Sequence, residues 1–243
     1  MIKVVVLAAG KGVRMQDTLP KVLVPINGRP MIEYLVKSII ASGVDSEPIV
    51  VVSPDNKEMI QNALAAWPCR FAIQRQQLGT GHALACALPE IKEKADHVVC
   101  FYGDHPFVQP ATIKKLATYE NGVLTIMTAT LPDFADWRQG LYYWGRIVRH
   151  EGRVEAIVEC KDATEEVKII KEVNPGFYCF EIGWLRRNIN KLNKNNVQQE
   201  YYLTDLVKVA FSQGIKINTL PIDPKESVGI NSKEELKLAE SLA

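Results

Sequence analysis

The sequence predicts an α/β domain with a mostly parallel central sheet and helices on both faces. Short apolar runs rich in β-branched residues alternate with segments of helical periodicity through the first 130 residues. The runs are typical of strands buried on both faces of a parallel sheet, and their alternation with helices is typical of repeated strand–helix units. Polar loops that contain glycine follow three of the runs, at the edge where open α/β sheets bind ligands.

The elements of the first half follow in the order that such a sheet requires. Residues 4–7 form the opening strand, and apolar residues recur at helical spacing after Pro30, which suits the first turn of a helix. The later elements are a strand at residues 49–53, a helix after Asp55, a strand near residues 71–74, a helix from about Gly81 and a strand at residues 97–102.

The pattern changes after about residue 140. Residues 145–150 and 153–159 predict a small antiparallel pair, turned at Glu151-Gly152. A helical stretch, a strand at residues 177–182 and a helix at residues 201–213 follow. No repeat, low-complexity tract or long linker interrupts the chain, so we expect residues 1–243 to form a single domain.

Composition restricts the class of protein. A net charge of +1 argues against binding nucleic acid through bulk electrostatics, and 47% hydrophobic residues suffice for a full core. No apolar stretch reaches the length of a membrane span and the N-terminus lacks a signal-peptide pattern, so no membrane association is expected. Five widely spaced cysteines without zinc spacing indicate reduced thiols in a cytoplasmic protein.

The loop after the opening strand carries Lys11, Arg14 and Lys21. Gly10 and Gly12 permit positive φ and let the backbone approach a ligand closely. Backbone N–H groups backed by cations form a nest for phosphate oxygens, which predicts a triphosphate site. The alternative is a structural turn between strand and helix. The spacing is not that of a P-loop. It is not that of the dinucleotide-binding motif G-x-G-x-x-G either, because residue 15, where the third glycine is required, is methionine.

Two further loops are expected at the same edge of the sheet, and together the three loops predict one shared nucleotide site. One loop contains Gln74 and Gln77, whose amides offer the donor and acceptor that a pyrimidine edge requires. Gly79 begins a Gly-Thr-Gly segment that allows backbone to approach the base and sugar. Gln77 could instead bond the loop backbone, and His82 could be a packed residue at a helix start.

The other loop places Asp104 just after a buried strand. A carboxylate there is suited to Mg²⁺, which prefers one or two carboxylates plus phosphates and waters. The alternative role is a helix N-cap. Asn231 could be a second metal ligand or the cap of the last helix. Glu159 and Asn174 could bind sugar hydroxyls or belong to surface turns, and the segment Trp144-Gly145-Arg146 could approach a ligand or serve hairpin packing.

Taken together, these segments resemble the uridyltransferase domain of bacterial N-acetylglucosamine-1-phosphate uridyltransferases, in the sugar-nucleotidyltransferase superfamily. The blocks keep their order and cover nearly the whole chain. The matching blocks are LAAGKGVRM (7–15), PKVL (20–23), QLGTGHA (77–83), YGDHP (102–106), WGRIVR (144–149), IVECKDAT (157–164), NPG (174–176), NNVQQEYYLTD (195–205) and VGIN (228–231).

The resemblance implies a Rossmann-like nucleotidyltransferase fold, with a nucleotide half at about residues 1–130 and a sugar-binding half at about 131–231. It implies UTP and N-acetylglucosamine 1-phosphate as substrates, UDP-N-acetylglucosamine and pyrophosphate as products, and Mg²⁺ as cofactor. Arg14 and Lys21 would neutralise the phosphates, and Asp104 and Asn231 would hold the metal. The implied nucleotide- and substrate-binding residues are Leu7, Ala8, Ala9, Gly10, Lys11, Gln74, Gln77, Gly79, Thr80, Tyr102, Gly103, Gly145, Glu159 and Asn174.

The chain departs from the family pattern on the sugar side. The usual Asn-Thr-Gly is Asn174-Pro175-Gly176, the usual tyrosine before Gly-Arg is Trp144, and the segment 132–143 is long and aromatic. No hexapeptide-repeat acetyltransferase half is expected. The alternatives are a related enzyme that uses another sugar phosphate or dTTP, a non-catalytic sugar-nucleotide sensor, and an NAD(P)-dependent oxidoreductase. The oligomeric state is left open.

Overall fold

The central strands of the sheet are parallel and almost completely buried. The computed structural model describes residues 1–10, 19–92, 94–119 and 122–229. Its sheet begins in the order β5 (Arg70–Ile73), β4 (Ile49–Val52), β1 (Ile2–Leu7) and β6 (His97–Tyr102), and each neighbouring pair is parallel. Because the carboxyl ends of parallel strands share one edge, the loops after β1, β5 and β6 lie together, as the sequence predicted.

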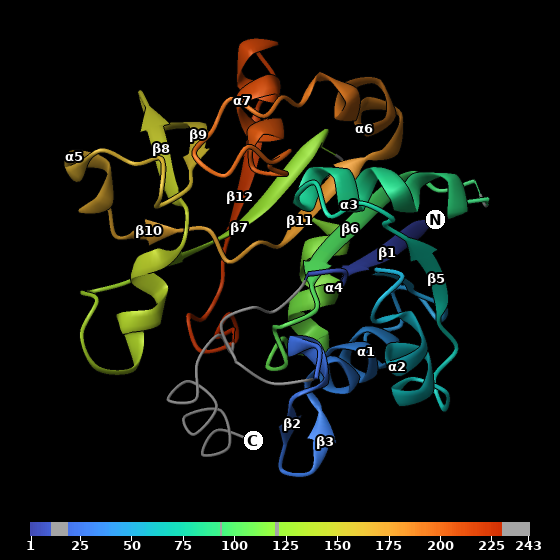
Figure 1. Cartoon of the computed structure of the whole chain (residues 1–243). Coiled ribbons are helices and arrows are strands. Elements are labelled where there is room, and N and C mark those ends of the chain that lie inside the picture. The colour runs from blue at the N-terminus through green and yellow to red at the C-terminus, as the bar shows by residue number, and fades with distance from the viewer. Residues whose placement is uncertain (11–18, 93, 120–121, 230–243) are drawn as a thin grey trace.

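The alternation of side chains along β1 explains why helices cover both faces of the sheet. Val4 and Val6 belong to one apolar cluster with α1 (Met31–Ala41) and α4 (Pro110–Thr118). Val5 and Leu7 belong to the opposite cluster, with α3 (Thr80–Ala87), α6 (Ile182–Asn188) and α7 (Asp205–Ser212). Successive strand residues point to opposite faces, so a continuous apolar run requires cover on both sides. Figure 1 shows α1 and α3 on the two sides of β1.

The second half of the chain extends the same sheet. β11 (Tyr178–Glu181) runs antiparallel to β6 and to β7 (Leu124–Thr130), and β12 (Ile217–Pro221) runs parallel along β7. The sheet is therefore mostly parallel, with β11 reversed between two strands of the common direction.

The predicted antiparallel pair is confirmed. β8 (Arg146–His150) pairs with β9 (Arg153–Val158), and β10 (Glu172–Val173) joins β8 to β7. Glu151 and Gly152 both have positive φ at the turn, which matches the right-handed twist of a hairpin. Figure 1 shows these strands at the far end of the same sheet from β5. The 3-10 helix η4 (Asp136–Tyr143) leads into β8. The remaining elements are η2 (Lys21–Leu23), β2 (Pro25–Ile26), β3 (Arg29–Pro30), α2 (Lys57–Ala63), η3 (Leu88–Glu90), α5 (Glu165–Lys168) and η5 (Ile189–Lys191).

Two boundaries differ from the sequence prediction for identifiable reasons. The helix expected from residue 201 begins at Asp205, because the N–H groups of Tyr201 and Leu203 bond to the segment before α3 and to Thr80 Oγ1 instead. The strand expected to reach residue 182 ends at Glu181, whose carboxylate accepts from two N–H groups and caps α6. In the part of the chain that the structure describes, every helix is too short or too polar to cross a bilayer.

Candidate functional site

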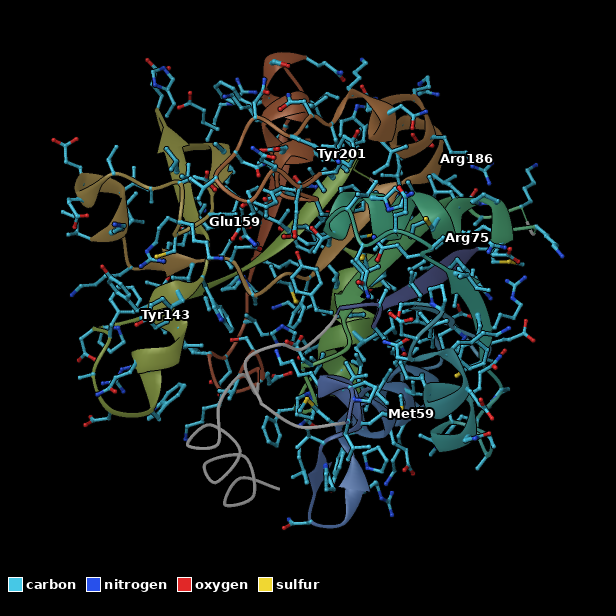
Figure 2. The ribbon with its side chains drawn as sticks, in the orientation of Figure 1. Met59, Arg75, Tyr143, Glu159, Arg186 and Tyr201 are labelled. Atoms are coloured by element: carbon cyan, nitrogen blue, oxygen red, sulfur yellow. The ribbon has the colours of Figure 1, made fainter. Side chains whose placement is uncertain are left out.

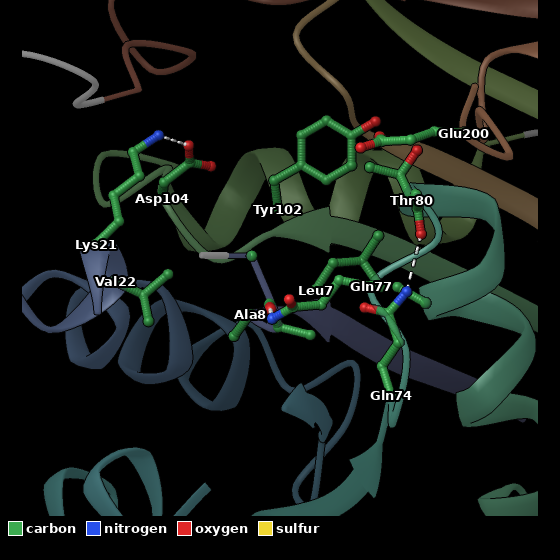
Figure 3. A pocket seen from close by; sticks show the side chains of 14 residues that line it. Leu7, Ala8, Lys21, Val22, Gln74, Gln77, Thr80, Tyr102, Asp104 and Glu200 are labelled. Atoms are coloured by element: carbon green, nitrogen blue, oxygen red, sulfur yellow. Dashed lines mark hydrogen bonds and ion pairs between the residues drawn. The ribbon is translucent and has the colours of Figure 1, made fainter. Parts of the chain in front are cut away.

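A cavity of about 670 Å³ opens at the carboxyl ends of β1, β5 and β6. Figure 3 shows it from close by. Three loops that are far apart in the sequence form its wall, and most of the residues predicted for nucleotide binding lie on it. The lining residues are Leu7, Ala8, Ala9, Gly10, Lys21, Val22, Gln74, Gln77, Gly79, Thr80, Ala83, Tyr102, Asp104 and Glu200.

The end of β1 is fixed by hydrogen bonds to the neighbouring strand and helix. Ala8 N donates to Val51 O at 2.9 Å, and Asn56 Nδ2 donates to Ala8 O at 2.9 Å. A Cβ added at Gly10 would meet no atom within 4 Å, and the φ of Gly10, contrary to the expectation, is not positive. The chain therefore enters the loop with open space beside Gly10. Lys11, Gly12 and Arg14 lie outside the described residues.

The two glutamines of the second loop are both held by backbone carbonyl groups. Gln77 Nε2 donates to Ala9 O at 2.6 Å, so this side chain bonds the loop backbone while it lines the cavity. Gln74 Nε2 donates to Gly79 O at 3.0 Å, the bond that is dashed in Figure 3. The bond from Gln77 ties the loop after β5 to the end of β1, and the bond from Gln74 closes the loop after β5 on itself.

The start of α3 packs tightly against a segment from the second half of the chain. Gly79 has a φ of +110°, and a Cβ there would lie 2.7 Å from Tyr201 O, so only glycine fits. Gly81 N donates to Tyr201 O at 2.8 Å, and Leu203 N donates to Thr80 Oγ1 at 3.0 Å. This contact brings Glu200 to the cavity, a residue that the sequence analysis did not assign to the site.

Lys21 and Asp104 face each other across the mouth of the cavity. Lys21 Nζ donates to Asp104 Oδ2, and the two side chains are only 16% and 21% exposed. Burial alone would raise the pKa of the Asp104 carboxyl, but the ammonium of Lys21 and the nearby His105 lower it to about 2. Asp104 is therefore ionised at neutral pH and paired with a cation at the position predicted for phosphate and metal.

His105 connects Asp104 to the C-terminal part of the described chain. Its Nδ1 lies 2.9 Å from Ser227 O, and because a carbonyl only accepts, Nδ1 carries the proton. Its Nε2 lies 3.6 Å from Asp104 Oδ1, and burial lowers the pKa of the imidazole. His105 was not predicted as a site residue, since in the sequence it is a single histidine after a strand.

The donor set near Asp104 fits Mg²⁺ in its chemistry. An ionised carboxylate at an open cavity is the kind of ligand that Mg²⁺ combines with phosphate oxygens and waters. Gly229 packs against the backbone of Asp104, since a Cβ added at Gly229 would lie 3.5 Å from Asp104 O. Asn231, the second predicted ligand, follows two residues later and lies outside the described residues.

A second cavity of about 360 Å³ adjoins the first on the side of the hairpin β8–β9. Thr80, Tyr102, Asp104 and Glu200 line both cavities, so the two share a wall. Figure 2 shows Glu159 inward of Tyr143, which is the last residue of η4. The residues that line only the second cavity are His105, Tyr143, Trp144, Gly145, Glu159, Asn174, Pro175, Gln198, Tyr202 and Gly229.

Polar groups in the second cavity are held in defined orientations. Thr204 Oγ1 donates to Glu159 Oε1 at 3.1 Å, and burial raises the pKa of this carboxyl. Asn174 Nδ2 donates to Tyr178 OH at 2.7 Å. The backbone N–H of Asn174 donates to Gly145 O at 2.9 Å, which joins the two predicted sugar-binding segments. The structure thus brings Gly145, Glu159 and Asn174 together.

The Asn-Pro-Gly turn supports Tyr102. Gly176 has a φ of +85°, and a Cβ there would lie 2.4 Å from Tyr102 Cε2, so the ring packs directly on the backbone. Gly103 lines neither cavity. Its backbone N–H donates to Leu7 O at 2.9 Å and so links the ends of β6 and β1. Of the described residues predicted for the site, Gly103 alone is set back from both cavities.

The aromatic segment 132–143 is anchored by a buried arginine. Arg146 is 0% exposed, and its guanidinium donates to the carbonyl oxygens of Tyr142, Trp144 and Lys168. Its Cζ also lies 4.9 Å from the centre of the Phe134 ring. Tyr143, by contrast, is 71% exposed at the rim of the second cavity. The segment therefore presents an aromatic ring beside the candidate sugar site.

Three of the lining residues that the sequence analysis missed belong to one segment, 198–202. Glu200, Gln198 and Tyr202 lie on the cavity walls only because the start of α3 bonds to this segment. The block NNVQQEYYLTD, which carried part of the resemblance, contained the signal for them.

Residues 4–158 match the family described as the MobA-like NTP transferase domain. The bifunctional protein GlmU of Alkalilimnicola ehrlichii is 38% identical over 242 residues, which cover 98% of this chain and 50% of that protein. The bifunctional protein GlmU of Caldicellulosiruptor saccharolyticus is 40% identical over 241 residues, which cover 97% of this chain and 50% of that protein. This chain spans about half the length of the curated relatives it matches.

A crystal structure described as a glucose-1-phosphate thymidylyltransferase from Bacillus anthracis has a similar fold. The TM-score is 0.78 at 16% identity, with 100% of this chain and 95% of that chain covered. At this identity the likeness concerns the fold, and it confirms the predicted Rossmann-like α/β architecture. The match of the family over most of the chain and the two relatives also confirm the resemblance seen in the motifs: the chain belongs to the MobA-like NTP transferase domain family, in the nucleotidyltransferase superfamily.

Proposed function

We propose that this protein is a Mg²⁺-dependent uridylyltransferase that forms UDP-N-acetylglucosamine and pyrophosphate from UTP and N-acetylglucosamine 1-phosphate. The observation that carries the proposal is the pair of adjoining cavities, which share Asp104 and Tyr102. A group-transfer enzyme has to bring its two substrates together at the reacting phosphates. The shared wall, next to the ion pair of Lys21 and Asp104, is where the two would meet.

The larger cavity is proposed to hold UTP. Gln74, Gly79 and Thr80 would read the base and ribose, and the end of β1 with Gly10 would lie along the phosphates. Lys21, together with Lys11 and Arg14, would supply positive charge there. Figure 3 shows Gln74 and Lys21 on opposite sides of the cavity, and Gly79 O accepts a hydrogen bond from Gln74, which supports this orientation.

The smaller cavity is proposed to hold the amino sugar. Gly145, Glu159 and Asn174, with Tyr102 from the shared wall, would contact its hydroxyl and acetamido groups. A carboxylate and an amide with fixed hydrogen-bond partners are suited to hydroxyl groups, because they keep a defined set of acceptors and donors for the ligand.

In the proposed reaction a phosphate oxygen of the sugar 1-phosphate attacks the α-phosphorus of UTP. The bond to the bridging oxygen breaks, and pyrophosphate leaves without a covalent enzyme intermediate. The chain contributes alignment and neutralisation of charge, which in phosphoryl-type transfers account for most of the catalysis. Lys21 and Arg14 would stabilise the charge that develops on the phosphates. Asp104 and Asn231 would hold Mg²⁺, which supplies further charge neutralisation between the phosphates when bound.

The proposal treats residues 1–243 as one catalytic domain, with a nucleotide half at about 1–130 and a sugar half at about 131–231. It places the reaction in the cytoplasm, with small-molecule substrates and without nucleic acid or membrane. The contact between the start of α3 and the segment 200–203 supports a single domain, because the two halves share a wall of the first cavity.

A second candidate is the same chemistry on another sugar phosphate, or with dTTP. It is favoured by the departures in the smaller cavity, where Trp144 and Pro175 stand in the lining and Tyr143 projects at the rim.

The test is the steady-state release of pyrophosphate across a panel of sugar 1-phosphates and nucleoside triphosphates, with and without Mg²⁺. The proposal predicts the highest kcat/KM for UTP with N-acetylglucosamine 1-phosphate, and activity only with Mg²⁺. Faster turnover of glucose 1-phosphate would contradict the sugar assignment. Ligand binding without turnover would favour a sensor, and tight binding of NADH would favour an oxidoreductase.

A further inference from the structure

The amide of Gln74 is locked in one orientation by two acceptors. Gln74 is 3% exposed, and its Nε2 lies 3.0 Å from Gly79 O and 3.1 Å from His82 Nδ1. A carbonyl oxygen can only accept a hydrogen bond, so the amide nitrogen and not the amide oxygen must face Gly79. The two hydrogens of the NH₂ group are thereby directed to Gly79 O and His82 Nδ1.

The same geometry fixes the tautomer of His82. Because Gln74 Nε2 is the donor, His82 Nδ1 must accept, and the ring proton of the neutral imidazole lies on Nε2. That nitrogen is 3.7 Å from Sγ of Cys86, one helical turn further along α3. The imidazole therefore bridges Gln74 and Cys86, and its acceptor side faces the glutamine.

The group of Gln74 that is left for a ligand is its oxygen. Both amide hydrogens are used by these partners, and the hydrogen bonds found among the described residues include none to Oε1. Gln74 lines the larger cavity, so it offers an acceptor and no donor to a bound base. Uracil and thymine carry an N3–H that donates to such an acceptor. Cytosine has a lone pair at N3, which would face the lone pairs of Oε1 without a hydrogen between them.

We infer that His82 is a positioning residue for base recognition: by accepting from Gln74 Nε2 it presents Oε1 to the base, and the site thereby selects pyrimidine nucleotides that carry an N3–H and rejects cytidine nucleotides. This inference rests on the proposed binding of a nucleoside triphosphate in the larger cavity. It gives His82 a role in specificity in addition to packing at the start of α3. A site built to hydrogen-bond a group on its ligand discriminates strongly against an analogue that lacks it.

The test compares the dissociation constants of UTP and CTP by isothermal titration calorimetry in the presence of Mg²⁺, using the full chain. The wild type is expected to prefer UTP by at least about a hundredfold. His82→Phe keeps a ring but removes the acceptor, so the amide is held by Gly79 O alone, and the UTP-to-CTP preference is expected to fall roughly tenfold. His82→Asn restores an acceptor near the Nδ1 position and should recover most of the preference. Cys86→Ala removes only the weak contact behind the ring and should leave the preference within about twofold.

Thermal unfolding identifies any variant that does not fold, and His82→Leu, which also lacks an acceptor, carries the same expectation as His82→Phe. An unchanged preference in folded His82→Phe or His82→Leu overturns the inference, as does a wild type that binds CTP as tightly as UTP. The binding preference for UTP over CTP is measured independently of catalysis, so it can fail or hold separately from the proposed function. A wild type that prefers UTP but releases no pyrophosphate with any sugar phosphate contradicts the uridylyltransferase and leaves the role of His82 standing.

Discussion

Asp104→Asn removes the negative charge that faces Lys21 while it keeps the size of the side chain. Burial alone would raise the pKa of the Asp104 carboxyl, whereas Lys21 and His105 lower it from 3.8 to about 2. One unit of pKa corresponds to about 1.4 kcal/mol, so the ionised carboxylate is expected to stabilise the folded chain by about 2 kcal/mol at pH 7. The variant should therefore lose about 2 kcal/mol in its free energy of unfolding.

The loss is expected to depend on pH in one direction. A folded-state pKa below the unfolded value gives stability that is complete above pH 3.8 and disappears as the pH falls toward about 2. Urea unfolding of both proteins between pH 7 and pH 3 measures this difference, which should narrow at the acidic end. The matched control is Asp136→Asn, an exposed aspartate with positive φ that asparagine tolerates, and we expect a change within about 0.5 kcal/mol.

Two results would contradict the stabilising role of the Asp104 charge. If Asp104→Asn is as stable as the original protein at pH 7, or more stable, the desolvation of the carboxylate outweighs its attraction to Lys21. If the difference stays constant down to pH 3, the effect comes from packing and not from the charge.

Three further substitutions test the site. Lys21→Met should lower kcat for pyrophosphate release by roughly ten- to a thousandfold, and unchanged turnover would exclude Lys21 from phosphate stabilisation. Gly176→Ala should destabilise the fold by about 3 kcal/mol in urea unfolding, because the new Cβ would meet the Tyr102 ring at a residue with positive φ. The control Gly152→Ala, also at positive φ but in open space, should cost only about 1 kcal/mol. Equal losses in the two variants would contradict the tight contact at Gly176. Tyr143→Ala should raise the KM for the sugar phosphate several-fold and leave the KM for UTP unchanged, and equal changes in both would show that the ring does not face the sugar.

The first half of the fold could be predicted because its strands are buried on both faces and therefore leave a continuous apolar signal. The run at residues 4–7 and the helical spacing after Pro30 each identify one element, and the parallel arrangement then places the following loops at one edge. Gly10, Gln74 and Asp104 line one cavity because they follow parallel strands of the same sheet.

The rest of the site depends on tertiary contacts that leave no local signal. Glu200 reaches the cavity only because Tyr201 bonds to the start of α3. The pairing of Lys21 with Asp104 joins residues 83 apart in the sequence. Likewise, the end of the 3-10 helix η4 is held by the buried guanidinium of Arg146, which donates to the carbonyl oxygens of Tyr142 and Trp144. Hydrophobic patterning does not predict a buried arginine.

The amide orientation of Gln74 also cannot be predicted from the sequence, because tertiary neighbours decide it. From the sequence, Gln74 is equally able to donate and to accept, and only the positions of Gly79 O and His82 Nδ1 decide which group remains for a ligand. Residue types in a motif predict the site, while the selectivity that we infer for it depends on neighbours that only the fold supplies.

A crystal structure of this chain with UDP-N-acetylglucosamine and Mg²⁺ tests the central proposal most directly. The account predicts uracil against Gln74, the diphosphate beside Gly10, Lys21 and Asp104, and the sugar among Gly145, Glu159 and Asn174. A diphosphate bound away from both Gly10 and Asp104, or a sugar outside the cavity of the β8–β9 hairpin, would contradict it.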